Sequence, residues 1–186
     1  LWRNWGHEDR RYARLRQHVE SQGKSYAWHS LIHVNIYQGI TVVIIAIPFL
    51  FAQVATEPVA LGTLAYLGSA LVLFGIAFEG MADLQLTRFR SNPTNEGRVL
   101  DSGLWRYSRH PNYFGEWLVW VGFFLMSYNS TYRGIPGLLC VGVIYYFLTR
   151  VTGIPLTEQQ LLTSKGPAYA DYQARVPAFW PRPPRR

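Results

Sequence analysis

The sequence predicts an all-α fold, a polytopic bundle of about four transmembrane helices that forms a single membrane domain over residues 1–186. Two observations lead to this fold class. Long apolar blocks, each near the roughly 20 residues that cross a bilayer, alternate with strongly basic segments, so the mean hydropathy of −0.01 describes neither kind of segment. Nearly all of the basic residues also fall on one side of the expected spans.

Four segments are expected to cross the membrane, in this order along the chain. Residues 31–54 and 59–78 are almost entirely apolar and long enough to span. Residues 113–128 form a shorter apolar segment that carries Glu116, so we expect this helix to be buried among the others. Residues 134–152 complete the bundle.

Small residues within these spans indicate how the helices pack. Gly62, Gly68 and Gly75 follow one another in or near the second expected span and let helices approach closely. The single cysteine, Cys140, lies within the last expected span, so an internal disulfide is excluded and packing is its expected role.

The positions of the 18 Lys and Arg residues predict the orientation of the chain. Six precede the first expected span, five lie between the second and third, six run from Arg150 to the C-terminus, and only Arg133 falls on the other side. We therefore expect both ends of the chain and residues 79–111 to be cytoplasmic. The basic excess then needs no nucleic acid partner, and contact with membrane lipid is expected instead.

Three segments outside the spans have distinct compositions. Residues 1–30 are basic and aromatic with helix-forming spacing. Residues 79–111 are rich in arginine and contain "FRSNPTNEGRVLDSG", whose Asn, Pro and Gly residues indicate turns. We expect this segment to be a cytoplasmic loop that contacts a cofactor. The tail "VPAFWPRPPRR" is rich in proline and arginine and is expected to be extended.

Two helix ends carry polar residues that a membrane span does not need. Glu79 and Asp83 are four residues apart and share a helix face, to which Arg90 returns seven residues later. Asn112 and Glu116 repeat the arrangement on the third span. Ionisable groups at the ends of apolar runs are costly, so a functional partner is the first hypothesis. Carboxylates and an amide can bind ribose hydroxyls or a carboxamide.

The arginines between the second and third spans can bind phosphate, because a guanidinium presents paired N–H groups to its oxygens. They are Arg88, Arg90, Arg98, Arg106 and Arg109. A structural alternative stays open, in which the two acids pair with arginines and Asn112 caps a helix. Together, the acidic helix ends and the arginine-rich loop favour a phosphate-bearing cofactor. With no GxGxxG or P-loop motif, its site must be built from membrane helices and their loop.

The histidines give a weaker signal. His29 and His33 have the four-residue spacing of metal ligands on a helix, but no carboxylate lies beside them in sequence, and we expect no metal site. In "RHPN", Pro111 is expected to fix the backbone at the start of a helix and so to direct His110 and Asn112.

The segment "GLWRYSRHPNYFGEWLVW", residues 103–120, resembles the steroid 5α-reductase family in its bacterial branch of small membrane proteins. It is more distantly similar to sterol reductases and isoprenylcysteine carboxyl methyltransferases. The resemblance extends over nearly the whole chain, through "RNWGHEDRRY", "EGMADLQLTRFR" and "YADYQARVPAFWP". It implies a protein of the bacterial inner membrane whose C-terminal half binds NADPH, while N-terminal helices enclose a lipid-like enone.

The resemblance also implies roles for matching residues. Asn112 and Glu116 correspond to groups that hold the nicotinamide side of the cofactor. Asp83, Arg90 and Arg98 correspond to groups around the adenosine and phosphates. The remaining positions that we place in the cofactor site are Tyr107, Arg109, His110 and Tyr172, with Arg3, Arg10 or Arg11 as a further phosphate contact.

Two departures from the family pattern matter. Glu79, which we also place in the cofactor site, stands where the steroid enzymes have an asparagine. Family members usually carry further upstream helices, which include the glutamate and tyrosine that polarise the substrate carbonyl. We therefore expect this chain to be the C-terminal, cofactor-binding part of a larger reductase, with the proton donor upstream of Leu1.

The function implied by the resemblance is reduction of the C=C bond of a steroid or other apolar enone with NADPH. Two alternatives remain open. The same architecture and a similar RHPxY turn serve methyltransferases that use S-adenosylmethionine, although their Arg-Ile and Glu-Glu pattern is reduced here to "IPLTEQQLL", with only Glu158. The other is a non-catalytic membrane module that binds a sterol or nucleotide.

Overall fold

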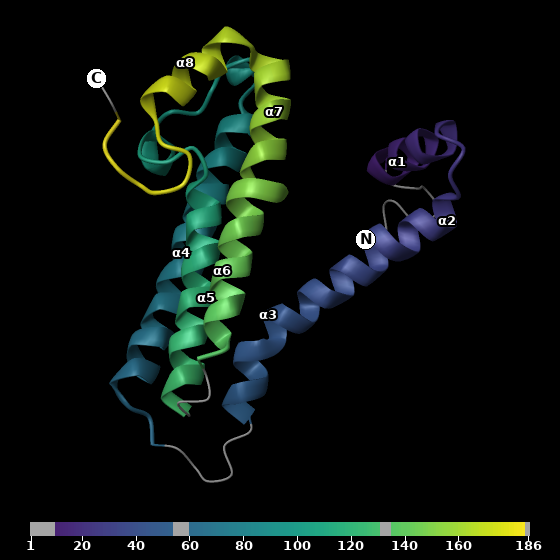
Figure 1. Cartoon of the computed structure of the whole chain (residues 1–186). Coiled ribbons are helices and arrows are strands. Elements are labelled where there is room, and N and C mark those ends of the chain that lie inside the picture. The colour runs from purple at the N-terminus through teal and green to yellow at the C-terminus, as the bar shows by residue number, and fades with distance from the viewer. Residues whose placement is uncertain (1–9, 54–59, 131–134, 185–186) are drawn as a thin grey trace. The chain divides into compact units, whose positions relative to one another are not determined.

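The part of the chain that the structure describes is mostly helical, which confirms the all-α fold class. Figure 1 shows the computed structural model, in which residues 10–53, 60–130 and 135–184 are described, and no strand occurs among them. The chain divides into two compact units, Leu1–Ile44 and Ile45–Arg186. The boundary falls within α3 (Tyr37–Gln53), and each of the other helices lies within one unit.

The unit Leu1–Ile44, described from residue 10 onward, starts with two short helices. The Arg16 guanidinium lies 5.6 Å from the ring centre of Tyr26 and so links the first helix to the second. Both helices agree with the helix-forming spacing of residues 1–30. The elements of this unit are α1 (Arg10–Ser21), α2 (Tyr26–His29), the π-helix η2 (Ser30–Ile36) and the first turns of α3 (Tyr37–Gln53).

Three helical runs among the described residues are long and apolar enough to cross a bilayer, namely Tyr26–Leu50, Thr63–Ser91 and Gly137–Lys165. The protein is therefore an integral membrane protein. The remaining segment expected to span is α5 (Pro111–Ser130), which has 20 residues and packs along α4 (Thr63–Ser91). The expected count of about four is consistent with these helices.

Two helical runs extend beyond the limits expected from hydropathy. α4 continues to Ser91, so residues 79–91 are helical and only residues 92–110 connect α4 to α5. The last span likewise passes residue 152, since the run Gly137–Lys165 continues beyond a bend at Thr152 and Gly153. It comprises α6 (Gly137–Tyr146), the π-helix η6 (Phe147–Val151) and α7 (Ile154–Lys165), and is followed by α8 (Pro167–Arg175).

α4 and α5 pack backbone against backbone through glycines. A Cβ on Gly68 would lie 2.6 Å from the carbonyl oxygen of Gly122, and one on Gly75 would lie 2.7 Å from that of Gly115. Steric repulsion forbids such distances, so only glycine fits at these positions. This confirms the close approach expected of Gly68 and Gly75, whereas Gly62 precedes α4 as its N-cap residue.

The last turns of α3, residues 45–53, belong to the same unit as α4–α8. The Phe49 ring lies 6.3 Å from the ring of Trp120 and 4.9 Å from that of Phe123, centre to centre. Both partners are on α5, so α5 is packed by α4 along one part of its surface and by α3 along another. This agrees with the expectation that the helix carrying Glu116 is buried among its neighbours.

The connection between α4 and α5 is held against α4 by hydrogen bonds, two of which come from Leu104 and Trp105. It contains the 3₁₀ helices η3 (Pro93–Asn95) and η4 (Gly103–Arg106). The indole N–H of Trp105 donates to the carbonyl of Ala82 at 3.0 Å, and the amide of Leu104 donates to the Gln85 side chain at 3.0 Å. The connection is thus tied to the last turns of α4.

The tail that follows α8 lies along the same connection and is not helical, as its prolines predict. The Ser108 hydroxyl donates to the carbonyls of Ala178 and Phe179 at 3.2 and 3.0 Å. The amide of Arg182 donates to the carbonyl of Tyr107 at 3.0 Å. Figure 1 shows this yellow tail beside the teal connection between α4 and α5.

We predict that Gly75→Ala lowers stability whereas Gly80→Ala does not. A Cβ on Gly75 would lie 2.7 Å from the carbonyl oxygen of Gly115, but one on Gly80, on the same helix, would meet nothing within 4 Å. Overpacking of this kind costs about 1–3 kcal/mol, while alanine in an exposed helix gains up to about 1 kcal/mol over glycine. Thermal unfolding of the detergent-solubilised protein measures both, and equal midpoints for the two variants would contradict the packing described.

Candidate functional site

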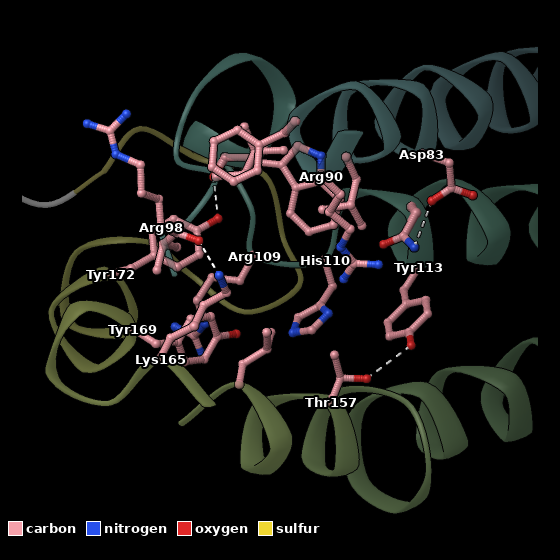
Figure 2. Close-up of a pocket in the computed structure, with 17 residues that line it drawn as sticks. Asp83, Arg90, Arg98, Arg109, His110, Tyr113, Thr157, Lys165, Tyr169 and Tyr172 are labelled. Atoms are coloured by element: carbon pink, nitrogen blue, oxygen red, sulfur yellow. Dashed lines mark hydrogen bonds between the residues drawn. The ribbon is translucent and has the colours of Figure 1, made fainter. Parts of the chain in front are cut away.

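A cavity of about 340 Å³ opens at the polar end of the helices in the unit Ile45–Arg186. Its walls come from the last turns of α4, the connection after it, the first turn of α5, α7 and α8. Figure 2 shows Arg98 and Lys165 on one side of this cavity and Asp83 and Tyr113 on the other. The volume lies within the range of small-molecule sites.

Asn112 lines this cavity and has an unsatisfied acceptor. Its side-chain N–H donates to the Asp83 carboxylate at 3.2 Å, and because a carboxylate only accepts, the amide nitrogen must face Asp83. The amide oxygen is buried and has no hydrogen-bond partner among the described residues. Asn112 is the second residue of α5 and does not cap it, so the capping interpretation is wrong. Asp83, for its part, forms no ion pair with a described arginine.

Three cationic side chains line the cavity without a carboxylate partner among the described residues. Arg90 is exposed on the last turn of α4, and Arg98 is exposed on the connection that follows. Lys165, the last residue of α7, donates to the carbonyl of Arg98. An ammonium has three donors, so Lys165 keeps two for a ligand. The cavity therefore has a cationic side that can bind an anion.

Arg109 also lines the cavity, but its side chain is already engaged. Its guanidinium donates to the Glu158 carboxylate at 2.5 Å and to the carbonyls of Gln173 and Val176 at 2.9 and 2.5 Å. His110 adds a contact of 3.3 Å to the same carboxylate. These bonds join the residues before α5 to α7, α8 and the tail, so Arg109 and His110 hold the wall of the cavity together.

Two buried tyrosines of α8 close the end of the cavity. The Tyr172 hydroxyl donates to the carbonyl of Trp105 at 2.5 Å. The Tyr169 hydroxyl lies near Arg109 and Glu158 but forms no well-aligned hydrogen bond with a described residue. Burial raises the pKa of Tyr169 and the pKa of Tyr172 above the usual phenol value, so both stay protonated at neutral pH.

The structure brings together most of the residues that the sequence places in the cofactor site. Glu79, Glu116 and Tyr107 are not among the residues that line the cavity. Arg3 lies outside the described residues, and Arg10 begins α1 in the other unit, where its side chain is not described. Those that do line it are Asp83, Arg90, Arg98, Arg109, His110, Asn112 and Tyr172.

Sequence reasoning missed a stripe of α7 that lines the cavity. Thr157, Leu161 and Lys165 are four residues apart in turn and therefore share one helix face. The Thr157 hydroxyl also lies 3.3 Å from the Tyr113 hydroxyl, across the cavity wall. The four-residue spacing could have identified this face, but nothing local in the sequence indicates that it turns toward the arginine-rich connection.

Comparisons with known proteins show which family the chain belongs to. A family model described as "Protein of unknown function (DUF1295)" matches residues 1–176. The chain belongs to this family. An uncharacterized protein of Schizosaccharomyces pombe is 29% identical over 96% of the chain and 56% of its own length. A Delta(14)-sterol reductase of Ascobolus immersus is 35% identical over 39% of the chain and 21% of its own length. No solved structure matches.

These similarities support the coarser part of the expected resemblance. This DUF1295 protein is related to a sterol reductase over part of its length, whereas membership of the 5α-reductases stays a prediction. The chain spans about half the length of the Schizosaccharomyces pombe relative and a smaller share of the sterol reductase. Both relatives are fungal proteins, which gives no support to the bacterial inner membrane, and the orientation of the chain stays a prediction as well.

We predict that Tyr172→Phe destabilises the protein whereas Tyr107→Phe leaves its stability unchanged. Tyr172 is buried, and its hydroxyl holds the carbonyl of Trp105. Removing the hydroxyl leaves that acceptor without its donor, which costs about 1–3 kcal/mol. Tyr107→Phe is the control, because it removes the same hydroxyl group from a side chain that is 44% exposed. Thermal unfolding distinguishes the two variants, and an unchanged midpoint for Tyr172→Phe would show that its hydroxyl has no structural role.

Proposed function

We propose that the cavity binds NADPH and that the protein reduces the C=C bond of an apolar enone, such as a steroid, that enters from the bilayer. The observation that carries this proposal is the buried, unpaired amide oxygen of Asn112, in one cavity with three cationic side chains that have no described carboxylate partner. The partial similarity to a Delta(14)-sterol reductase supports a reductase. NADPH, in turn, needs both an acceptor for its carboxamide and cations for its phosphates.

The cationic side of the cavity fits the phosphates. Arg98 and Lys165 lie together, because Lys165 donates to the carbonyl of Arg98 and its remaining N–H groups are available. Arg90 adds a guanidinium from α4. We assign the 2′-phosphate to Arg98 and Lys165, since a charged phosphate gains most from direct contact with guanidinium and ammonium donors.

The opposite side of the cavity fits the carboxamide. Because Asp83 holds the nitrogen of the Asn112 side chain, the free oxygen is oriented to accept a hydrogen bond from an NH₂ group. Glu116 lies one turn further along α5 on the same face. We propose Glu116 as a second acceptor for the carboxamide, reached by a ligand that extends from the cavity toward the membrane helices.

The chain's own residues bind and orient in this proposal. When bound, the nicotinamide supplies a hydride to the β-carbon of the enone. Asn112 holds the carboxamide at the membrane end of the cavity, and the helices around it exclude water from the reacting atoms. The proton that completes the reduction comes from a group that we do not place in this chain.

A cofactor comparison tests the proposal. The purified full chain is titrated with NADPH and with S-adenosylmethionine, and oxidation of NADPH is then followed at its absorbance band with an enone steroid added. We expect NADPH to bind, S-adenosylmethionine not to bind, and oxidation of NADPH to depend on the enone. Tighter binding of S-adenosylmethionine would replace the reductase with a methyltransferase, and binding of NADPH without oxidation would indicate a binding module.

We predict that Arg98→Ala weakens binding of NADPH more than binding of NADH. The two cofactors differ by the 2′-phosphate, and loss of a charge-assisted hydrogen bond lowers affinity by about tenfold or more. Arg88→Ala is the matched control, because Arg88 is an exposed arginine of the same segment that does not line the cavity. Equal losses for both cofactors would move Arg98 to the shared pyrophosphate, and unchanged affinities would remove it from the site.

A further inference from the structure

A second cavity of about 480 Å³ lies beside the first and shares Arg109 with it as a wall. It is formed by the end of α6, the π-helix η6, the end of α8 and the tail. Because Arg109 is held by Glu158 and two carbonyls, it separates the two spaces. The second cavity is therefore a site of its own.

The residues that line this second cavity include four arginines and no carboxylate. Two of the arginines are neutralised, Arg109 by Glu158 at 2.5 Å and Arg175 by Asp171 at 2.9 Å. The other two, Arg150 and Arg182, form no side-chain hydrogen bond or ion pair with any residue that the structure describes. The cavity thus keeps two guanidinium groups for an anion.

Arg150 is positioned where an unpartnered charge is costly. It lies within the run Gly137–Lys165, about 20 Å along the helix from Gly137 at 1.5 Å per residue. Arg150 is the first charged residue of this run, and the span expected from hydropathy, residues 134–152, ends two residues later, so Arg150 lies near the boundary of the hydrocarbon layer. Ionisable groups within a span normally have a partner of opposite charge.

The surroundings of the cavity are those of a membrane interface. The rings of Tyr145 and Phe179 are 5.2 Å apart, and those of Phe179 and Trp180 are 5.3 Å apart, centre to centre. Trp180 is 49% exposed, and Tyr146, on the same helix as Tyr145, is 58% exposed. Tyrosine and tryptophan gather where the acyl chains meet the headgroups. A ligand here would have an apolar part beside its charged part.

We propose that this second cavity binds the phosphate group of an anionic phospholipid, held by Arg150 and Arg182. A phosphate only accepts hydrogen bonds, and each guanidinium presents paired donors that match its oxygens. The exposed ring of Trp180, which lines the cavity, then lies against the acyl chains. This binding does not depend on the proposed reduction, because it uses neither Asn112 nor the cationic side of the first cavity.

Lipid retention by the full chain tests this site. The detergent-solubilised protein is incubated with phosphatidylglycerol or phosphatidylcholine of the same acyl chains, and bound lipid is measured by native mass spectrometry. We expect phosphatidylglycerol to bind more tightly, and Arg150→Gln and Arg182→Gln each to weaken it by about tenfold. Arg88→Gln, which removes an exposed arginine away from both cavities, should leave it unchanged.

The remaining outcomes separate the sources of the phosphate. If inorganic phosphate displaces phosphatidylglycerol and binds with the same dependence on Arg150 and Arg182, the site takes soluble phosphate as well. Equal retention of the two lipids, or an equal loss in Arg88→Gln, would overturn the proposal and leave only general attraction between a basic surface and lipid. Arg182→Gln keeps the test decisive if Arg150→Gln fails to fold, because only the backbone of Arg182 forms a described hydrogen bond.

Discussion

The close contact between the backbones of α4 and α5 is the constraint on which the candidate site depends. Two glycines on each helix remove the side chains that would hold the helices apart. In a membrane this contact is favourable because dispersion forces and backbone dipoles act at short range, without a hydrophobic driving force. The glycine contacts fix which residues of α4 face which residues of α5, and this alignment continues to the polar ends of both helices. There it places Asp83 of α4 against Asn112 of α5, and this pairing leaves the buried amide oxygen of Asn112 without a partner among the described residues.

A second constraint acts at the polar end of the helices, where one carboxylate joins α7, α8 and the residues before α5. Glu158 of α7 binds Arg109 and His110 before α5, and it accepts from Gln173 of α8 at 2.9 Å. Arg109 also holds two carbonyls of the segment that leads into the tail. The arginines of this region therefore divide into two groups, those used for folding and those without a partner of opposite charge. Sequence composition counts both groups alike, but only the second group can recognise a phosphate.

The two cavities follow from the same arrangement. Arg109 and its partners form the wall between the two cavities. Each cavity also has cations without a carboxylate partner among the described residues, Arg98 and Lys165 in the first and Arg150 and Arg182 in the second. The first cavity adds polar acceptors, and we propose that it binds the two ends of a dinucleotide. The second adds aromatic rings, of which that of Trp180 is exposed, and we propose that it binds a phosphate that carries acyl chains. Phosphate chemistry is common to both, and the neighbouring groups distinguish their ligands.

The sequence by itself determined the helical membrane fold, because hydropathy over 20 residues and the positions of small residues such as Gly68 and Gly75 are local properties of each helix. It also predicted Asp83, Asn112 and Arg98 at one cavity, since polar residues at the ends of apolar helices gather at the same membrane face. Only the tertiary structure decided that Arg109 forms an ion pair with Glu158 and that α7 contributes Lys165 to the cavity. It also decided that Glu79 and Glu116 do not line the cavity. These facts depend on which faces of distant helices meet, and residue spacing within one helix cannot specify that.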